Sequence, residues 1–211
     1  MIFRSANEQD FDQLLTLMTG ASLRDPLNMK IFRQHFGQSG RLFNFIARVQ
    51  RVRLHQMLNK QYVVVGVVDN QVIAAAVLAP NRWMPISFGQ YLQAGAFSLF
   101  PECWTLPLLK SVQQYRLVQK VLHKRMSRHT WVLQKLVVNP MYEEALLGQQ
   151  MLEDGIFPEL RRLHVDCVLS TTTMPEQQHF FAKNHFELVE VLKLHVGQLG
   201  VENWCFQRSL S

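Results

Sequence analysis

The sequence predicts an α/β protein with one mixed β-sheet and helices on both of its faces. Three observations support this fold class. Two apolar runs, YVVVGVV (62–68) and VIAAAVLAP (72–80), flank an Asp-Asn turn, which is typical of a β-hairpin. A strand, a helix and a second strand follow within 131–173, the pattern of a parallel pair with a crossover helix. The runs 186–194 and 202–210 then favour a closing antiparallel pair.

The first sixty residues indicate one short strand and three helices. Ile2–Ser5 is β-like, and Asn7 to Thr19 places its large apolar side chains on one helical face. The segments 28–37 and 42–58 also have a helical period. In the second of these, most of the arginines fall off the apolar stripe. We therefore expect the apolar stripes to pack on the sheet and the arginines to face outward.

The segment after the hairpin is the least regular part of the chain. Residues 81–106 combine six large aromatic side chains with repeated Pro and Gly, which favours irregular structure. These aromatics are compatible either with the wall of a substrate groove or with a second small core. Residues 108–126 then have the pattern of a basic amphipathic helix. Because we find no repeat or flexible linker, we expect one domain, 1–211, with an insert at about 81–127.

The C-terminal third alternates strands and helices. WVLQKLVV (131–138) is a strand with a long apolar run, and a helix is expected from about Leu146 to Leu163. HVDCVLSTTT (164–173) is the next strand, and PEQQHFFAKN (175–184) is a short helix. This alternation predicts that the 131–138 and 164–173 strands run parallel and side by side.

Composition excludes several classes of protein. A hydrophobic content of 48% with 18% charged residues is that of a folded protein, and no apolar run is long enough to span a bilayer. The three cysteines are widely spaced, and no pair of cysteines or histidines has metal-ligand spacing. The N-terminal residues MIFRSANEQD have no secretory pattern. We therefore expect a cytoplasmic protein with reduced thiols and no bound metal.

The positive charge is concentrated in the first two thirds of the chain. The net charge is +6, which divides into +11 for residues 1–142 and −5 for residues 143–211. Such asymmetry is compatible with an anionic ligand, a nucleic acid, a membrane surface, or an ordinary solvated basic face. Nucleic-acid binding is not expected, because the sequence has no helix-turn-helix or RNP-type pattern.

The stretch VVNPMYEEALLGQQML (137–152) joins a strand to a helix and admits two interpretations. A loop at such a junction can direct backbone N–H groups at a phosphate. Alternatively, Asn139 is a good N-cap and Pro140 a good first helical residue, so that the helix would begin there and leave no loop. Glu143 and Glu144 suit a helix start, whereas each would oppose a pyrophosphate roughly 8 Å away by about 2 kcal/mol at an effective dielectric of 20.

Taken with the order of elements, two motifs resemble the GCN5-related N-acetyltransferase (GNAT) superfamily. LVVNPMYEEALLGQQML (136–152) is similar to the acyl-CoA motif, in which a V-x-P strand end leads to Q/R-G-x-G-x-G/A and a helix. EQQHFFAKNHFELV (176–189) is similar to the N-x-x-F-Y-x-x-x-G-F segment of that family. The resemblance covers nearly the whole chain, and both motifs are incomplete, which marks a divergent member.

The resemblance implies acetyl-CoA, or CoA, as the cofactor. The glycine-rich run falls on 143–148, and of its three glycines only Gly148 is present. The residues implied in cofactor binding are Leu136, Val137, Val138, Glu143, Glu144, Ala145, Leu146, Leu147, Gly148, Gln149 and Gln177. The basic helix 108–126 and the arginines of 48–53 are candidate partners for the CoA phosphates.

The resemblance also implies acetyl transfer to a small amine. The tyrosine that serves as general acid in the family falls on Phe181, which has no proton to give, and the glycine after it falls on His185. Candidate substitutes for the acid are His179, His185 and Tyr142. The alternative function is a GNAT-fold protein without catalysis, which binds CoA or another ligand as a sensor or interaction module. The sequence names neither the amine nor the oligomeric state.

Overall fold

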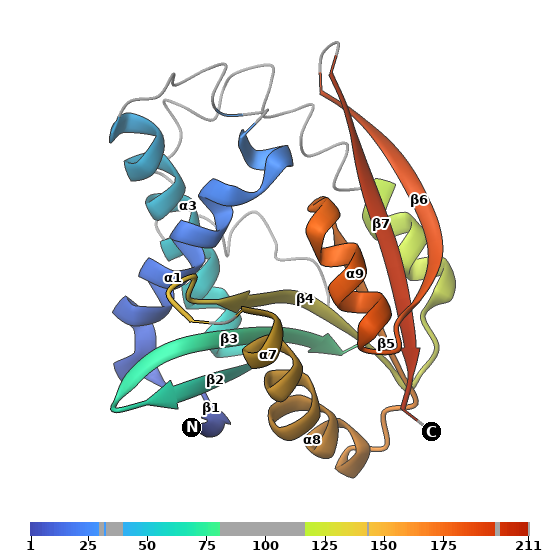
Figure 1. Ribbon diagram of the computed structural model, residues 1–211, viewed down its shortest axis with the longest axis horizontal. Helices are drawn as coiled ribbons and strands as arrows, with labels where there is room; N and C mark the ends of the chain where they lie inside the picture. Colours follow the sequence, from blue (N-terminus) through green and yellow to red (C-terminus); the bar gives the residue numbers. More distant parts are fainter. Residues whose placement is uncertain (30–31, 33–39, 81–116, 143, 197–198, 211) are drawn as a thin grey trace.

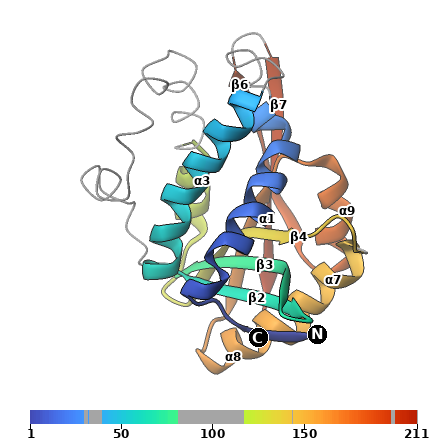
Figure 2. The same ribbon diagram turned by 90° about the vertical axis from the view of Figure 1, so that its left-hand side faces the viewer.

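A computed structural model describes the chain except for residues 30–31, 33–39, 81–116, 143, 197–198 and 211. It contains a seven-stranded sheet in the order β1-β2-β3-β4-β5-β7-β6 (Figure 1). Helices lie on both faces of this sheet (Figures 1 and 2). The predicted fold class is therefore confirmed. Among the described residues, no helix is long and apolar enough to cross a membrane.

The first arm of the sheet is an antiparallel run of four strands. These are β1 (Ile2–Ser5), β2 (Tyr62–Val68), β3 (Gln71–Pro80) and β4 (Thr130–Val138). The predicted hairpin is β2–β3, and both of its turn residues, Asp69 and Asn70, have positive φ. Two positive φ values are what a two-residue type I′ turn requires, and Asn and Asp tolerate them better than most residues.

The second arm contains β5 (Cys167–Thr172), β6 (Glu187–Val196) and β7 (Leu199–Ser209). β7 pairs antiparallel with both β5 and β6, and so lies between them. The two arms meet where β4 and β5 run parallel, as the sequence predicts. The sheet therefore consists of two antiparallel arms joined by one parallel pair.

One face of the sheet is covered by α1 (Phe11–Arg24) and α3 (Gly40–Lys60) (Figure 2). A short 3-10 turn, η1 (Glu8–Asp10), precedes α1. The side chains of α1 and α3 pack with alternate residues of β2, β3 and β4 in one core cluster. A helix at 117–125, the described part of the predicted basic helix, packs on the second arm with Val132, Leu169 and Leu194.

The opposite face carries the helices that follow β4 and β5. They are α7 (Glu144–Gln150), the π-helical segment η3 (Met151–Ile156), α8 (Phe157–Arg162) and α9 (Pro175–Lys183) (Figure 1). Their apolar side chains form the largest described core cluster, together with residues of β3, β4, β5 and β7. α7 and α9 thus stand on the same face, above the two arms on either side of the β4–β5 junction.

Several predicted boundaries differ from the structure. The first helix runs to Arg24 rather than Thr19, because Ser22 continues its buried face beyond the predicted end. The strand predicted from residue 164 begins at Cys167, since His164 has a positive φ and ends the preceding helical segment. The aromatic segment 81–106 and part of 28–37 and 108–126 lie outside the described residues.

Candidate functional site

The two arms of the sheet separate on one side of a short parallel junction. β4 pairs with β5 only over Thr130–Leu133, opposite Cys167–Ser170. Beyond that point β4 stays with β3 as far as Val138, while β5 stays with β7 as far as Thr172. At the apex, Ser170 Oγ donates to the Leu133 carbonyl at 3.1 Å. We call the region beyond this bond, between residues 134–138 and 171–173, the β4–β5 split.

A β-bulge lies at the start of the split. The β3–β4 register shifts between Val77, opposite Lys135, and Leu78, opposite Leu133, which leaves Gln134 without a paired residue. One extra residue reverses the alternation of a strand, so that the side chains beyond it change face. Lys135 consequently shares a face with Val137, which packs with α1 and α3. Without the bulge, Lys135 would point at the α7 side.

Backbone N–H groups of β4 point into the split. The Asn139 N–H donates to the Ile73 carbonyl at 2.7 Å, which sets the phase of β4 against β3. Because an antiparallel ladder alternates, Leu136 and Val138 then direct their backbone polar groups away from β3, toward β5. The Val138 carbonyl accordingly accepts from Arg24 Nη2 at 3.5 Å instead of from a strand. Within the described residues, β5 provides no pairing partner for this part of β4.

A polar cluster closes the split on the α1 and α3 side. Lys135 Nζ lies 3.3 Å from both Ser22 Oγ and Gln50 Oε1, and Gln50 Nε2 donates to Ser22 Oγ at 2.9 Å. Ser22 and Gln50 are both buried. α1, α3 and β4 therefore meet through hydrogen bonds where most of the surrounding core is apolar. We refer to Lys135, Ser22, Gln50 and Asp25 as the Lys135 cluster.

Asp25 extends this cluster to the other arm of the sheet. Its Oδ1 accepts from the Leu27 and Asn28 N–H groups at 2.8 and 3.1 Å, which caps the short helical turn at 26–29. The same oxygen accepts from Thr173 Oγ1 at 3.2 Å, just after β5 ends. The end of α1 therefore contacts both strands that border the split, through Lys135 on β4 and Thr173 beyond β5.

The surroundings of Lys135 change its protonation. Burial of the ammonium lowers the pKa of Lys135 from 10.5 to about 7, and repulsion from Arg53 acts in the same direction. Asp25 opposes these effects by attraction. Because Lys135 keeps some exposed surface, water moderates the desolvation without removing it. Lysine can therefore be neutral here near pH 7, which an exposed lysine is not.

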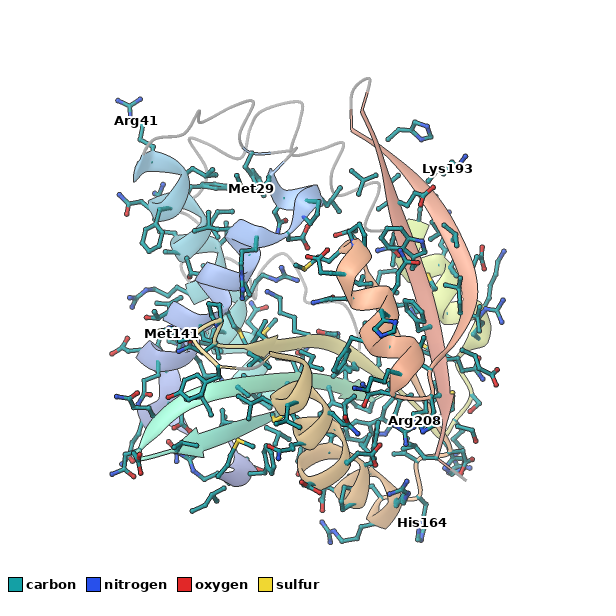
Figure 3. The ribbon with its side chains drawn as sticks, viewed as in Figure 1. Met29, Arg41, Met141, His164, Lys193 and Arg208 are labelled. Carbon is teal, nitrogen blue, oxygen red and sulfur yellow. The ribbon has the colours of Figure 1, made fainter. Side chains whose placement is uncertain are left out.

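The junction after β4 is a loop rather than a helix start. Asn139 Oδ1 accepts from the Met141 N–H at 3.0 Å, and the Asn139 carbonyl accepts from the Tyr142 N–H at 3.0 Å. These bonds make a turn, and helix α7 begins only at Glu144. The interpretation with the helix beginning at Asn139 and Pro140 is wrong, because the Asn139 side chain caps a turn of its own. Met141 projects from this loop and is 89% exposed (Figure 3).

Gly148 has a packing role that the sequence does not reveal. It lies inside α7, and a Cβ placed on it would be 2.8 Å from Cε2 and 2.9 Å from Cζ of Phe180 on α9. Such separations are far below normal contact distance. Gly148 therefore lets the Phe180 ring lie directly against the α7 backbone, and this contact joins the helices on the two sides of the split.

The other predicted cofactor-binding residues are placed in different environments. Val137 is buried on the α1 and α3 side, whereas Leu136, Val138 and Leu147 pack on the α7 side. Leu146 is 49% exposed, and Gln149 is exposed. Glu143 lies outside the described residues, while Glu144 and Ala145 form the first turn of α7. Gln177 bonds through Oε1 to Thr172 Oγ1 at 2.6 Å, at the end of β5.

The residue in the tyrosine position of the family is part of the core. Phe181 is 4% exposed and stacks on Phe206 at 4.9 Å between centroids, with Phe186 edge-on at 5.1 Å. His179 and His185 are both exposed, and Tyr142 is 39% exposed in the loop after β4. His185 follows the last turn of α9, whereas the Thr172–Gln177 bond places the split at the first turn. These positions bring none of the candidate acids together with the Lys135 cluster.

The predicted cationic partners of a CoA phosphate lie on the opposite face. Lys120, Lys124 and Arg125 are exposed on the 117–125 helix, and Arg125 bonds to the Val189 carbonyl of β6 at 3.2 Å. This helix packs on the face that carries α1 and α3, so the expectation that these residues reach the loop before α7 is wrong. The described residues contain no group of three His, Cys, Asp or Glu side chains that could hold a metal.

Known structures share this arrangement of strands and helices. A GNAT-family acetyltransferase from Streptococcus pneumoniae matches with a TM-score of 0.58 at 11% identity, over 100% of this chain and 99% of that one. The chain has the GNAT fold. The agmatine N-acetyltransferase gives 0.61 at 14% identity, and the C-terminal condensation domain of Ebony gives 0.65 at 9%. Both of these cover 99% of this chain and 98% of their own. No protein-family profile matches the sequence, and no curated protein is similar to it in sequence.

The two arms of the sheet are arranged as in the GNAT fold. Sequence identities as low as these support a shared fold and no shared function. The sequence predicts both helices that border the split, whereas it leaves the loop after β4 and a helix start at Asn139 as alternatives. Sequence patterns missed Lys135, Ser22, Gln50 and Asp25. The available signal was a lysine within the apolar strand 131–138, since a buried strand excludes charge unless it has partners.

Proposed function

We propose that this GNAT-fold chain transfers an acetyl group from acetyl-CoA to a small amine. The observation that carries this proposal is the β4–β5 split, which has backbone donors on one side and a polar cluster at its end. Unpaired strand N–H groups are unusual in a sheet interior, because a buried donor without a partner costs about 1–3 kcal/mol. In bound acetyl-CoA, the thioester carbonyl and the amide carbonyls of the pantetheine chain would accept hydrogen bonds from the N–H groups of Leu136 and Val138.

The chain's own residues suit the separate tasks of this reaction. The Leu136 and Val138 N–H groups can hold a carbonyl oxygen and stabilise negative charge that develops on it. The loop at 139–142 and the first turn of α7 present backbone N–H groups that lack helical partners, which suits a pyrophosphate. Phe180, packed on Gly148, and Gln177, bonded to Thr172, border the same region from α9.

The proposal is tested by binding and turnover together. Acetyl-CoA at about 100 times its Kd should stabilise the chain by roughly 2.7 kcal/mol, which a thermal shift detects. An amine panel that includes agmatine and dopamine, assayed for release of free thiol, then tests transfer. Absence of a thermal shift at millimolar acetyl-CoA would contradict the cofactor, and so would an equal shift with adenosine diphosphate at the same concentration.

A second candidate function is binding of CoA or another ligand without catalysis. It is favoured by Phe181, which fills the acid position with a buried ring and no proton. A missing general acid costs typically 10²–10⁴-fold in rate. A clear acetyl-CoA shift without thiol release from any amine in the panel would support this second function. Turnover of any amine in the panel would exclude it.

We further propose that the protein acts in the cytoplasm and does not bind nucleic acid. Cys167 and Cys205 are free thiols in the structure, and burial raises the pKa of both, for Cys205 to about 11. Thiols with raised pKa values are poor nucleophiles, and unpaired thiols are typical of proteins in a reducing compartment. A gel shift with duplex DNA and single-stranded RNA at physiological salt should show no complex.

A further inference from the structure

Among the described residues, the Lys135 amine has two hydrogen-bond acceptors, Ser22 Oγ and Gln50 Oε1. A neutral amine has two N–H donors and one lone pair, whereas an ammonium has three donors and no lone pair. Ser22 Oγ and Gln50 Oε1 accept two bonds from Nζ, each 3.3 Å long. Gln50 Nε2 donates to Ser22 Oγ as well, so Gln50 is held with its oxygen toward Lys135. Two donors satisfied by two acceptors leave the lone pair of a neutral amine available.

The charges that act on Lys135 come from two segments. Asp25, at the end of α1, attracts the ammonium, and Arg53 on α3 repels it. Thr173, just after β5, is neutral. Asp25 Oδ1 already accepts from two backbone N–H groups and from Thr173. Its negative charge is therefore shared among three donors and compensates Lys135 only in part. Arg53 adds repulsion, which together with burial brings the pKa of Lys135 to about 7.

The location of this amine is set by the β4 bulge. The bulge at Gln134 turns Lys135 to the α1 and α3 side, immediately before the Leu136 N–H that faces the split. The amine that can hold or release a proton near neutral pH therefore lies one residue from the backbone donor assigned to the acyl carbonyl. Thr173 and Asp25 border the same place from the other arm.

We propose that Lys135 Nζ is the general base that takes the proton from the ammonium group of the acceptor. This inference rests on the proposed acetyl transfer and assigns a catalytic residue to it. Ser22 and Gln50 are positioning residues, because they fix the two N–H bonds of Lys135 and so direct its lone pair. The acceptor site is accordingly on the α1 and α3 side of the sheet, opposite the α7 loop.

The proton balance of the reaction is complete with this one base. The acceptor arrives as an ammonium ion and gives one proton to the Lys135 lone pair, which frees its own lone pair. A C–N bond forms between the amine and the acetyl carbon, and the C–S bond of the thioester breaks. The second N–H proton ends on the departing thiol, and Lys135 returns its proton to solvent. The net change is one amide, one free thiol and one released proton.

Two other roles for Lys135 make different predictions. A purely structural lysine would affect folding but would leave the pH dependence of turnover unchanged. A neutral lysine next to a thioester could also attack it, in which case Lys135 itself would carry the acetyl group. Mass spectrometry of the peptide containing Lys135, after incubation with acetyl-CoA, separates this last role from the proposed one. A stable acetyl group on Lys135 that no amine can remove would overturn the assignment.

The first experiment measures the protonation of Lys135 without any need for turnover. The ¹³Cε resonance of Lys135 is assigned by its loss in Lys135→Met and followed from pH 5 to pH 11 in the whole chain. We expect a midpoint near 7, against 10.5 for an unperturbed lysine. A midpoint of 9 or higher for Lys135 would overturn the proposal.

The second experiment measures kcat against pH for wild type, Lys135→Met, Lys135→Arg and the matched surface control Lys124→Met. The probe is the amine from the agmatine and dopamine panel that releases most thiol. In the wild type and Lys124→Met, kcat should rise with pH to a plateau above about pH 7. In both Lys135 variants kcat should be about 10²–10⁴-fold lower and should show no inflection near pH 7. Acetyl-CoA should still shift the melting temperature of all four proteins.

The outcomes separate the inference from the function on which it rests. If the wild type turns over and Lys135→Met is equally active, Lys135 is not the base, although acetyl transfer stands. The same conclusion follows if kcat of Lys135→Met still inflects near pH 7. If wild type binds acetyl-CoA but no amine is acetylated, the proposed transfer fails, and the base assignment fails with it. That second outcome is recognised because the NMR midpoint near 7 persists without turnover.

Discussion

Lys135 links the protonation of a single residue to the stability of the chain. Its pKa is about 7 in the folded chain and 10.5 as a free lysine, so the unfolded state binds more protons between these values. The free energy of unfolding therefore rises with pH from 7 to 10.5, and below pH 7 the contribution is constant and most unfavourable. In Lys135→Met this part of the slope should disappear, measured by urea unfolding at pH 6, 8 and 10.

The absolute stability of Lys135→Met is not the test, because Ser22 and Gln50 lose a donor in the variant. The test is how the difference in unfolding free energy between Lys135→Met and wild type changes with pH. Relative to wild type, the variant should be most stable at pH 6 and lose this advantage toward pH 10. A difference that is constant from pH 6 to pH 10 would mean that Lys135 stays protonated in the folded chain.

His185 occupies a backbone conformation that favours glycine. Its φ is 59°, and its N–H donates to the Ala182 carbonyl at the end of α9. This is the left-handed position that ends many helices, where a side chain costs about 1–2 kcal/mol relative to glycine. Part of that gain is offset by the freedom of glycine in the unfolded chain. His185→Gly should therefore stabilise by about 0.5–1 kcal/mol in thermal unfolding.

The matched control for His185→Gly is Ala182→Gly, three residues earlier on the exposed side of α9. Glycine in a helix interior costs about 1 kcal/mol relative to alanine, so this variant should be less stable than wild type. Loss of stability in both variants would show that the position of the glycine is irrelevant. The positive φ also gives a physical reason for the glycine that the family motif has at this position.

At the scale of elements, α7 and α9 are joined by the packing of Phe180 on Gly148. Gly148→Ala gains helix propensity of about 1 kcal/mol but places a Cβ against the Phe180 ring. We expect a net loss of about 1 kcal/mol in wild type and a gain of 0.5–1 kcal/mol in a Phe180→Ala background. Denaturant unfolding of the four proteins in a double-mutant cycle measures this coupling.

Additive effects within about 0.5 kcal/mol would rule out the proposed contact between α7 and α9. Glycine at 148 was read from the sequence as the last glycine of a phosphate motif, which is a conformational role. The structure adds a steric role inside a helix, and the part of Gly148 in cofactor binding stays a prediction. Sequence spacing could not distinguish these roles, because the ring that needs the space comes from residue 180, in another element.

β4 shows the same limit at the level of a strand. Its bounds were predicted to within one residue, because an apolar β-rich run ends at Asn139-Pro140. The bulge at Gln134 could not be predicted, since it depends on the register with β3 and on the divergence of β5. The bulge determines on which face of the sheet the Lys135 side chain lies. Sequence periodicity alone therefore could not predict the Lys135 cluster.

For the whole molecule, Arg208 joins the two arms on the α7 side. It extends from β7, and Nη1 donates at 2.9 Å both to Glu153 Oε1 on η3 and to the Asn184 carbonyl after α9. Its guanidinium also lies 4.1 Å from the centroid of Phe157. Arg208 lies close to the lower end of α9 in Figure 3. One side chain thus contacts segments that follow both β4 and β5.

Arg208→Ala should destabilise the chain by about 2–3 kcal/mol, because its partners lose charge-assisted bonds and the ring contact at a side chain that is 10% exposed. Arg162→Ala is the matched control. Arg162 pairs with Glu159 within α8 but is 72% exposed, and such surface pairs contribute less than about 1 kcal/mol. Equal losses in urea unfolding would contradict a special role for Arg208.

At this scale the sequence predicted the mixed sheet, the hairpin and the strand–helix–strand unit, because each has a local periodic signal. It could not predict that β4 and β5 pair over only four residues each before separating. Pairing is a long-range property, fixed by the helices and side chains that cover each arm. The site belongs to that level, since Ser22, Gln50, Lys135 and Thr173 come from four separate segments.

The most direct test of the account is amide hydrogen exchange with and without saturating acetyl-CoA. The Leu136 and Val138 N–H groups face the split, so the ligand should slow exchange in peptides covering 134–148 and 170–178. The edge pair β6–β7, at 187–195 and 200–209, should be unchanged. Protection confined to the split is the predicted result. Unchanged exchange at 134–148 with millimolar acetyl-CoA would contradict the claim that the β4–β5 split holds the thioester.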